Sequence, residues 1–154
     1  MVTTIRQIQG FRRHLLAEIA DLTEEELNRI PSGCPNNIAW QLGHVIAAQQ
    51  MLCYVRAGLP VLIPEAFYLP FLTGTRPETV TSAADIAELK RLATATLDQL
   101  ADDYTQGKFL SYSPSAGIQK VYGFPVTHID EALSYLLYHE GYHAGQVRYL
   151  KNLI

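Results

Sequence analysis

Apolar side chains recur along this chain at intervals of three and four residues in four separate segments. This spacing places them on one face of an α-helix, because an α-helix has about 3.6 residues per turn. The predicted helices cover approximately residues 3–21, 38–57, 82–102 and 127–154. No segment shows the alternation of apolar and polar residues that is typical of a half-buried β-strand. We therefore expect an all-α protein, a four-helix bundle.

Three of the predicted helices begin at residues whose side chains can accept a hydrogen bond from the first helical turn. These residues are Asn36 or Asn37 for the second helix, Ser82 with Asp85 for the third, and Thr127 with Asp130 for the fourth. The stretch "TEEE" at residues 23–26 predicts a short additional helix.

Long loops follow the second and third helices. Residues 58–81 and 103–126 both exceed the roughly 12–15 residues beyond which loops tend to be functional or disordered. The first connection is apolar and rich in proline, so we expect it to pack against the bundle, to cover a pocket or to contact a second subunit. The second contains "VYGFPV" at residues 121–126, which predicts a brief extended segment before the last helix.

Composition narrows the class of protein. A chain of 154 residues favours one domain over residues 1–154, and 48% apolar residues, 18% charged residues and a net charge of -3 are typical of a globular protein that binds no nucleic acid. The opening "MVTTIRQIQGF" lacks the apolar run of a signal peptide, and polar residues interrupt the most apolar region, so we expect a cytoplasmic protein without a membrane segment.

The two cysteines, Cys34 and Cys53, form no C-x-x-C pair, and we predict reduced thiols. Cys34 is either structural or a nucleophile beside a histidine, and the structural role is the more common.

The histidines carry the candidate chemistry. "HEGYH" at residues 139–143 matches the zinc-protease pattern H-E-x-x-H. The row expected to face the interior of the last helix is Ala132, Leu136, His139, His143, Gln146, Leu150 and Leu153. His44 has the same kind of position among the core residues of the second helix. Three inward-facing histidines from two helices can converge on one point.

Two interpretations of this convergence follow. Three neutral imidazoles form an open site for zinc, nickel or ferrous iron. Alternatively, the histidines are hydrogen-bonded to Tyr135, Tyr138 and Tyr142, since an unpartnered buried imidazole costs about 1–3 kcal/mol. His14 is expected at the surface, and His128 lies about 16 Å of axial rise from His139, so neither is expected to be a ligand.

The sequence argues against a protease. A metzincin-type extension of H-E-x-x-H requires Gly at position 146 and His at 149, where this chain has Gln146 and Tyr149. No further His, Asp or Glu follows, and no strand is available to hold a peptide substrate.

The motifs "NNIAWQLGHVIAAQ" and "HEGYHAGQVRYL" resemble those of the DinB family of metalloenzymes, over nearly the whole chain. The shared patterns are W-x-x-x-H in the second helix and H-x-x-x-H-x-G-Q in the last. The resemblance implies a divalent metal ion held by His44, His139 and His143, an up-down-down-up bundle and a homodimer. It also implies thiol-dependent transferases or isomerases as relatives, which use bacillithiol, mycothiol or a similar low-molecular-weight thiol.

The leading hypothesis is a metal-dependent S-transferase or isomerase of small molecules, in which the ion activates the thiol. The alternatives are a hydrolase that uses a metal-bound hydroxide, and a metal-binding module without turnover. We expect Glu140 to face solvent rather than to reach a metal-bound water, and Gln146 to hydrogen-bond near the ligands. Arg56 and Arg148 are candidates for binding carboxylates of a thiol cofactor, although the sequence places neither at a pocket.

Overall fold

The computed structural model describes residues 2–154 and, over that range, consists of helices and loops without a β-strand. The α-helices are α1 (Val2–Glu18), α2 (Glu24–Asn28), α3 (Ile38–Gln49), α4 (Ala83–Thr105), α5 (Ala116–Tyr122) and α6 (Ile129–Lys151). A π-helical segment, η1 (Gln50–Val55), continues α3, and two short 3-10 turns, η2 (Glu65–Phe67) and η3 (Leu69–Phe71), follow in the next connection. The prediction of an all-α protein is confirmed.

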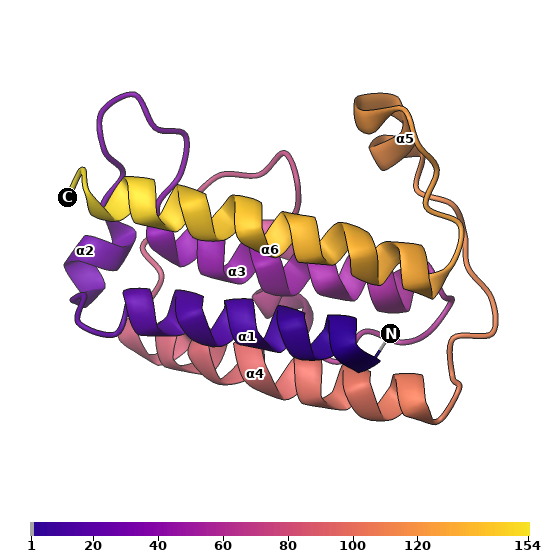
Figure 1. Cartoon of the computed structure of the whole chain (residues 1–154). Helices are drawn as coiled ribbons and strands as arrows, with labels where there is room; N and C mark the ends of the chain where they lie inside the picture. Colours follow the sequence, from indigo (N-terminus) through magenta and orange to yellow (C-terminus); the bar gives the residue numbers. More distant parts are fainter. Residues whose placement is uncertain (1) are drawn as a thin grey trace.

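Four long helices lie side by side (Figure 1). Both α1 and α3 pack against α4 and α6, so each of the four has two long neighbours. Their facing rows of apolar residues meet in a core with almost no solvent exposure, which includes Ile8, Ile46, Leu89 and Leu136. None of the described helices combines the length and the apolar character that crossing a membrane requires.

Two of the predicted helix caps are confirmed, as is the extra helix. The side chains of Asn37 and Ser82 accept hydrogen bonds from the backbone at the starts of α3 and α4, and a complete capping box between Thr23 and Glu26 opens α2. Each cap satisfies a backbone N–H that has no partner inside its helix.

The predicted cap of the last helix is wrong. The N-cap residue of α6 is His128 rather than Thr127. Thr127 donates hydrogen bonds from its backbone nitrogen and its hydroxyl to Glu131, which lies one residue beyond the expected partner. Asp130 instead accepts from the hydroxyl of Tyr104. The longer side chain of Glu131 reaches back over the helix start, which leaves Asp130 free to bind another element.

The first long connection packs against the four helices. Phe71 is buried, and its ring lies so close to Gly43 of α3 that a Cβ atom on this glycine would stand 2.4 Å from the ring. The absence of a side chain at Gly43 therefore allows the connection to approach α3. This contact confirms packing against the bundle among the three roles expected for residues 58–81.

The second long connection contains a helix where an extended segment is predicted. Val121 and Tyr122 are the last two residues of α5, so the prediction for residues 121–126 is wrong at its start, and the remainder forms no strand. Ser115 caps the beginning of α5, and Gly123, with φ 78°, ends it in the left-handed conformation that glycine adopts without strain. In Figure 1, α5 stands beside the first turns of α6, to one side of the four long helices, and its Ile118 is buried in their core.

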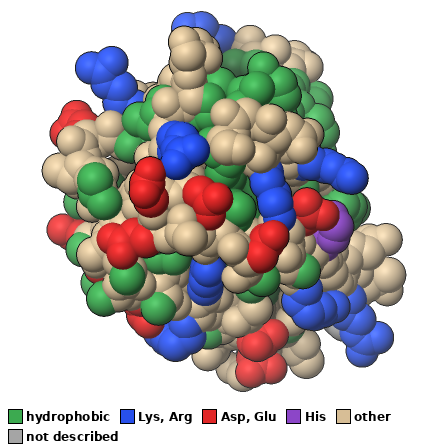
Figure 2. Space-filling model, turned by 90° about the vertical axis from the view of Figure 1, so that its left-hand side faces the viewer, with side chains coloured by type: hydrophobic (Ala, Val, Ile, Leu, Met, Phe, Trp, Pro, Cys, Tyr) green, Lys and Arg blue, Asp and Glu red, His purple; other side chains and the backbone are tan. Residues whose placement is uncertain are grey.

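Charged side chains of both signs are mixed on the molecular face that carries α2 and the C-terminus (Figure 2). Acidic and basic groups alternate there beside an apolar area, and no broad field of one sign covers this face.

Candidate metal centre

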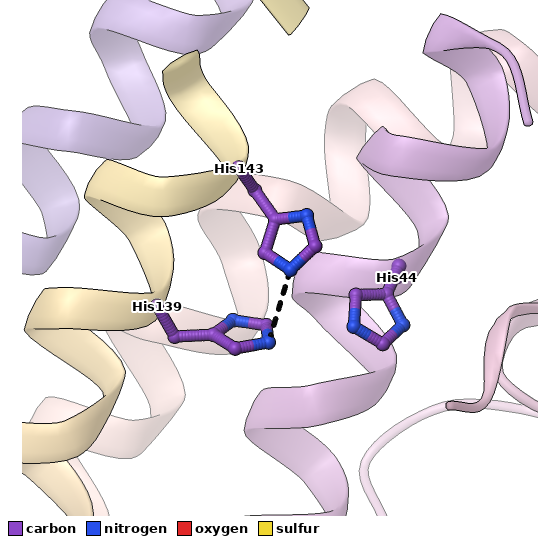
Figure 3. A group of neighbouring side chains, drawn as sticks. All are labelled: His44, His139 and His143. Atoms are coloured by element: carbon purple, nitrogen blue, oxygen red, sulfur yellow. Dashed lines mark hydrogen bonds between the residues drawn. The ribbon is translucent and has the colours of Figure 1, made fainter. Parts of the chain in front are cut away.

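Three histidines that are far apart in the sequence converge in the interior. His44 comes from α3, whereas His139 and His143 lie on consecutive turns of α6. One ring nitrogen from each residue lies within 4.8 Å of the others, and the Nε2 atoms of His139 and His143 are 3.1 Å apart. Figure 3 shows the three imidazole rings gathered between the two helices.

The outer nitrogens of two rings are held by hydrogen bonds. Nδ1 of His44 donates to the carbonyl oxygen of Phe71 at 2.7 Å, and Nδ1 of His143 donates to Oε1 of Gln41. The amide of Gln41 is itself oriented, because its Nε2 donates to Oδ1 of Asn36 at 2.9 Å. A proton on Nδ1 leaves the lone pair on Nε2. His44 and His143 are therefore fixed in the tautomer that binds a metal through Nε2.

His139 lacks such a partner. Its Nδ1 is buried and, among the described residues, makes no hydrogen bond. Without a cation, Nε2 of His139 has to donate its proton to Nε2 of His143, because two lone pairs at this distance repel each other. A cation shared by both nitrogens removes the repulsion. Two nitrogens of one tetrahedral zinc site lie about 3.3 Å apart, close to the spacing present here.

Burial keeps the three imidazoles neutral. Desolvation, followed by the neighbouring imidazoles and the charge of Arg12, lowers the pKa of His139 to about 2. The same causes lower the pKa of His143 to about 3, and desolvation also lowers the pKa of His44, against the hydrogen bond to Phe71. Neutral imidazole is the form that coordinates a metal ion, so at pH 7 the cluster needs to lose no proton before it binds one.

Trp40 fixes the plane of the His44 ring. The two rings are stacked, with centroids 4.6 Å apart and planes 9° from parallel. The indole nitrogen of Trp40 in turn donates to Thr75 at 3.1 Å, which anchors the stack to the first long connection. The W-x-x-x-H spacing thus corresponds to two rings on successive turns of one helix face.

The tyrosine interpretation of the cluster finds no support in the hydrogen bonds. Tyr135 and Tyr142 contact His139 and His143 through their rings, with centroids 6.0 Å and 5.1 Å apart. Within the described part of the chain, no tyrosine hydroxyl hydrogen-bonds to the three histidines.

Glu140 does not face solvent, and that prediction is wrong. Its side chain is 1% exposed and accepts hydrogen bonds from Nε and Nη2 of Arg12, which is itself 0% exposed. Arg12 also donates to the backbone carbonyls of Ala93 and Val45. A step of one residue turns the side chain about 100° round the helix, and α6 is covered by α1 as well as by α3. Glu140 therefore points into a second part of the interior.

Neither Arg12 nor Gln41 is predicted from the sequence. Arg12 occupies a regular position in the apolar row of α1, between Ile8 and Leu15, where an apolar residue is expected. That single charge in a buried row was the available signal. Gln41 makes the hydrogen bond to a candidate ligand, His143, that is predicted for Gln146. The side chain of Gln146 is half-buried and forms no hydrogen bond in the described part of the chain.

Other residues considered from the sequence lie outside the cluster. His14 and His128 have side chains 59% and 54% exposed, each beside a glutamate on its own helix. Both cysteines are free thiols, and burial raises the pKa of Cys53. Leu153 is exposed beyond the end of α6, although it belongs to the row predicted to face inward.

The histidines open onto a cavity of about 520 Å³ with mainly aromatic and apolar walls. None of the described side chains that line it is Asp or Glu. Arg56 lines the cavity, whereas Arg148 does not and is exposed. A larger hollow of about 800 Å³ is lined in part by Tyr122, Tyr135 and Tyr138. None of the three converging histidines lines it. The candidate chemistry therefore belongs to the smaller cavity.

The comparisons with known proteins agree with this geometry. The family model of the DinB superfamily matches residues 7–147, a range that contains all three histidines. No curated protein matches the chain. With more than half of its length matched, the chain belongs to the DinB superfamily.

Proposed function

From the DinB membership and the histidine cluster, we propose that His44, His139 and His143 bind a divalent metal ion through their Nε2 atoms. The observation that carries this proposal is the pair of Nδ1 hydrogen bonds, to Phe71 and Gln41, which leaves the Nε2 lone pairs of His44 and His143 available in a buried site. The three candidate ligand atoms of this site lie within 4.8 Å of one another. A cation can bind these available lone pairs, whereas an apolar core gains no stability from burying them. The donor set suits zinc, nickel or ferrous iron.

We further propose that the protein is a thiol-dependent S-transferase or isomerase. A divalent ion held by three imidazoles lowers the pKa of an entering thiol and stabilises the thiolate for attack on an electrophile. The chain itself contributes an aromatic and apolar cavity, which excludes water from the thiolate, and the Trp40 stack, which fixes His44. Desolvation makes the thiolate a stronger nucleophile.

A hydrolase is the second candidate, and the lining of the cavity favours it less. Hydrolysis benefits from a general base that takes a proton from the attacking water. None of the described lining residues is a carboxylate, and Glu140 is bound by Arg12. A thiol needs less help because it is far more acidic than water. A metal-binding module without turnover is the third candidate.

Metal analysis tests the site. Purified protein is expected to bind about one equivalent of zinc, whereas His44→Ala and His143→Ala are expected to bind much less. His14→Ala is the matched control, because its imidazole is exposed and outside the cluster. Equal zinc content in all four proteins would show that the ligands are wrong.

An activity screen separates the three candidates. With zinc present, low-molecular-weight thiols are expected to raise the melting temperature of the wild type and to be conjugated to an electrophile such as monochlorobimane. Hydrolysis of a p-nitrophenyl ester without any response to thiols would favour the hydrolase. Zinc binding without either activity would favour the non-catalytic module.

The proposal extends to architecture and assembly. We propose the up-down-down-up order for α1, α3, α4 and α6, supported by the pairing of α1 and α3 with the same two neighbours. A homodimer is proposed from the family resemblance alone, and sedimentation equilibrium of the purified protein tests its stoichiometry. The cytoplasmic location expected from the sequence stays a proposal.

A further inference from the structure

The lining of the cavity at the histidine cluster carries a positive charge and no negative one among the described residues. Arg56 is its one permanently charged lining residue among those described, and no carboxylate faces it. An isolated cation in a largely apolar cavity attracts an anionic group of a ligand more strongly than the same cation at an open surface, because less water screens it.

Arg56 is held in place without being neutralised. Its Nη1 donates to the carbonyl oxygen of Pro114 at 2.8 Å, and its own backbone oxygen accepts from the nitrogen of Ser113 at 2.7 Å. One side-chain hydrogen bond leaves most of the guanidinium donors available. The other arginines that lack a carboxylate partner in the described part of the chain are Arg6, Arg13, Arg76 and Arg148, and all four are exposed. Arg56 alone among these is half-buried.

The position of Arg56 relative to His44 sets the shape of the ligand. His44, Ala48, Leu52 and Arg56 follow one another at intervals of four residues, and all four line the cavity. They form one ridge along α3 and η1, with an imidazole at one end, a guanidinium at the other and apolar side chains between. Twelve residues of α-helix correspond to about 18 Å of axial rise, and the distance here is shorter because η1 is a π-helix, which rises less per residue.

A second part of the cavity lining, from α5, is apolar as well. The helix α5 contributes Ile118 and Val121 to the cavity lining. A ligand that lies along the ridge therefore meets apolar surface on both sides of its middle section.

We propose that Arg56 binds the carboxylate of an elongated, largely apolar substrate or cosubstrate whose other end reaches the histidine cluster. The anchoring of the carboxylate rests on the cavity and on Arg56, whereas the binding of the reactive end rests on the metal function proposed above. The ligand class is thus an apolar chain or ring system with a terminal carboxylate, and the guanidinium selects it against neutral molecules of the same size.

A matched pair of probes tests the two ends independently. The affinities of 8-mercaptooctanoate and 8-mercaptooctanol are measured by calorimetry with zinc-loaded and with EDTA-treated protein. The carboxylate is expected to bind about tenfold more tightly than the alcohol in both forms. Arg56→Gln is expected to abolish this preference, Arg56→Lys to retain part of it, and Arg148→Gln, an exposed control, to leave it unchanged.

The possible results separate the two proposals. Equal affinities for the two probes in the wild type, or a preference that survives Arg56→Gln, would overturn the role of Arg56. A gain in affinity on zinc loading that is shared by both probes reports the metal site instead. If zinc loading gives no gain in affinity while the carboxylate probe still binds more tightly than the alcohol, the result would count against the metal function and would support the role of Arg56.

Chemical modification keeps the test decisive if Arg56→Gln does not fold. Phenylglyoxal modifies accessible guanidinium groups, and mass spectrometry of peptides reports each arginine separately. In the wild type, 8-mercaptooctanoate is expected to slow the modification of Arg56 several-fold while Arg148 reacts as before. Protection by 8-mercaptooctanol to the same extent would show that the carboxylate does not contact Arg56.

Discussion

The helix α6 contributes to two buried polar clusters, and they differ in whether their hydrogen-bonding groups have partners. Glu140 and Arg12 form a closed pair, because Arg12 donates to both carboxylate oxygens and to two backbone carbonyls from α3 and α4. The histidine cluster is open, since Nδ1 of His139 has no partner among the described residues and the rings border a cavity. Both clusters are almost free of solvent exposure, so burial alone does not distinguish them.

The difference separates a structural role from a functional one. A buried charge pair that uses four of the five guanidinium donors holds its helices in one arrangement, and neither Arg12 nor Glu140 lines the cavity at the histidines. A buried cluster of neutral imidazoles with an unpartnered nitrogen can still bind a ligand through its ring nitrogens. We therefore propose that Arg12 and Glu140 position α6, and that His44, His139 and His143 bind the ligand.

The largest expected effect comes from breaking the closed pair. Arg12→Met leaves the carboxylate of Glu140 buried without a partner and is expected to lower the free energy of unfolding by about 3–5 kcal/mol. The double variant Arg12→Met/Glu140→Met is expected to recover most of this loss. Urea denaturation measures both, with Arg13→Met as the exposed control. A double variant no more stable than Arg12→Met would contradict a coupled pair.

The second effect is a pH dependence of the metal-free protein. The pKa of His139 is lowered to about 2 and that of His143 to about 3, whereas both are near 6.5 in the unfolded chain. Below pH 6.5 the unfolded state therefore binds more protons than the folded state, and stability is lost as the pH falls. The expected loss is about 2–4 kcal/mol between pH 7 and pH 5.

Urea denaturation across this pH range checks the sign and the origin of the effect. His143→Gln is expected to reduce the slope, and His14→Gln, at the surface, is expected to leave it unchanged. A stability that rises on acidification would show that the imidazoles are not held neutral in the folded protein.

The third effect concerns the orientation of one ligand. Gln41→Leu removes the acceptor of Nδ1 of His143 and is expected to weaken zinc affinity about 10–100-fold. Gln146→Leu is the matched control and is expected to leave the affinity unchanged, because the side chain of Gln146 makes no hydrogen bond in the described part of the chain. Competition with a chromogenic chelator measures both. If the two variants bind zinc equally, Gln41 does not orient the ligand.

The smallest effect is expected at Gly43. Gly43→Ala forces the ring of Phe71 to move, which costs about 1–3 kcal/mol, while alanine in a helix gains about 1 kcal/mol over glycine. The net loss of stability is expected to be about 0–2 kcal/mol, with weaker zinc binding because the Phe71 carbonyl that holds His44 shifts. Gly145→Ala, which has open space around it in α6, is expected to stabilise the protein. Thermal denaturation and zinc titration compare the two, and unchanged zinc binding in Gly43→Ala would show that the Phe71 contact is dispensable.

Part of the site was predictable because helical periodicity is local. The spacing of His139 and His143 places both on one face of any α-helix, and the apolar row around His44 predicts its burial. The irregular elements were less predictable. The helix α5 depends on two end signals, Ser115 and Gly123, in a stretch whose apolar residues also suit an extended chain.

Glu140 shows where a local pattern is insufficient. The sequence predicts one apolar stripe for the last helix, but α6 packs against both α1 and α3, so its buried arc is wider than one stripe. A residue about 100° away from His139 is then still inside the protein. Arg12 makes this burial possible, and it lies 128 residues away in the sequence.

The sequence by itself determined the four long helices, most of the inward-facing row on each and the three histidines available to a metal, because these follow from repeat lengths of three and four residues. Only the tertiary structure decided which partners these side chains meet. Gln41, Phe71 and Arg12 act through contacts between elements that are distant in the chain, and such contacts depend on how the helices pack. For the same reason, only the packed structure places Arg56 at the cavity and closes Glu140 into an ion pair.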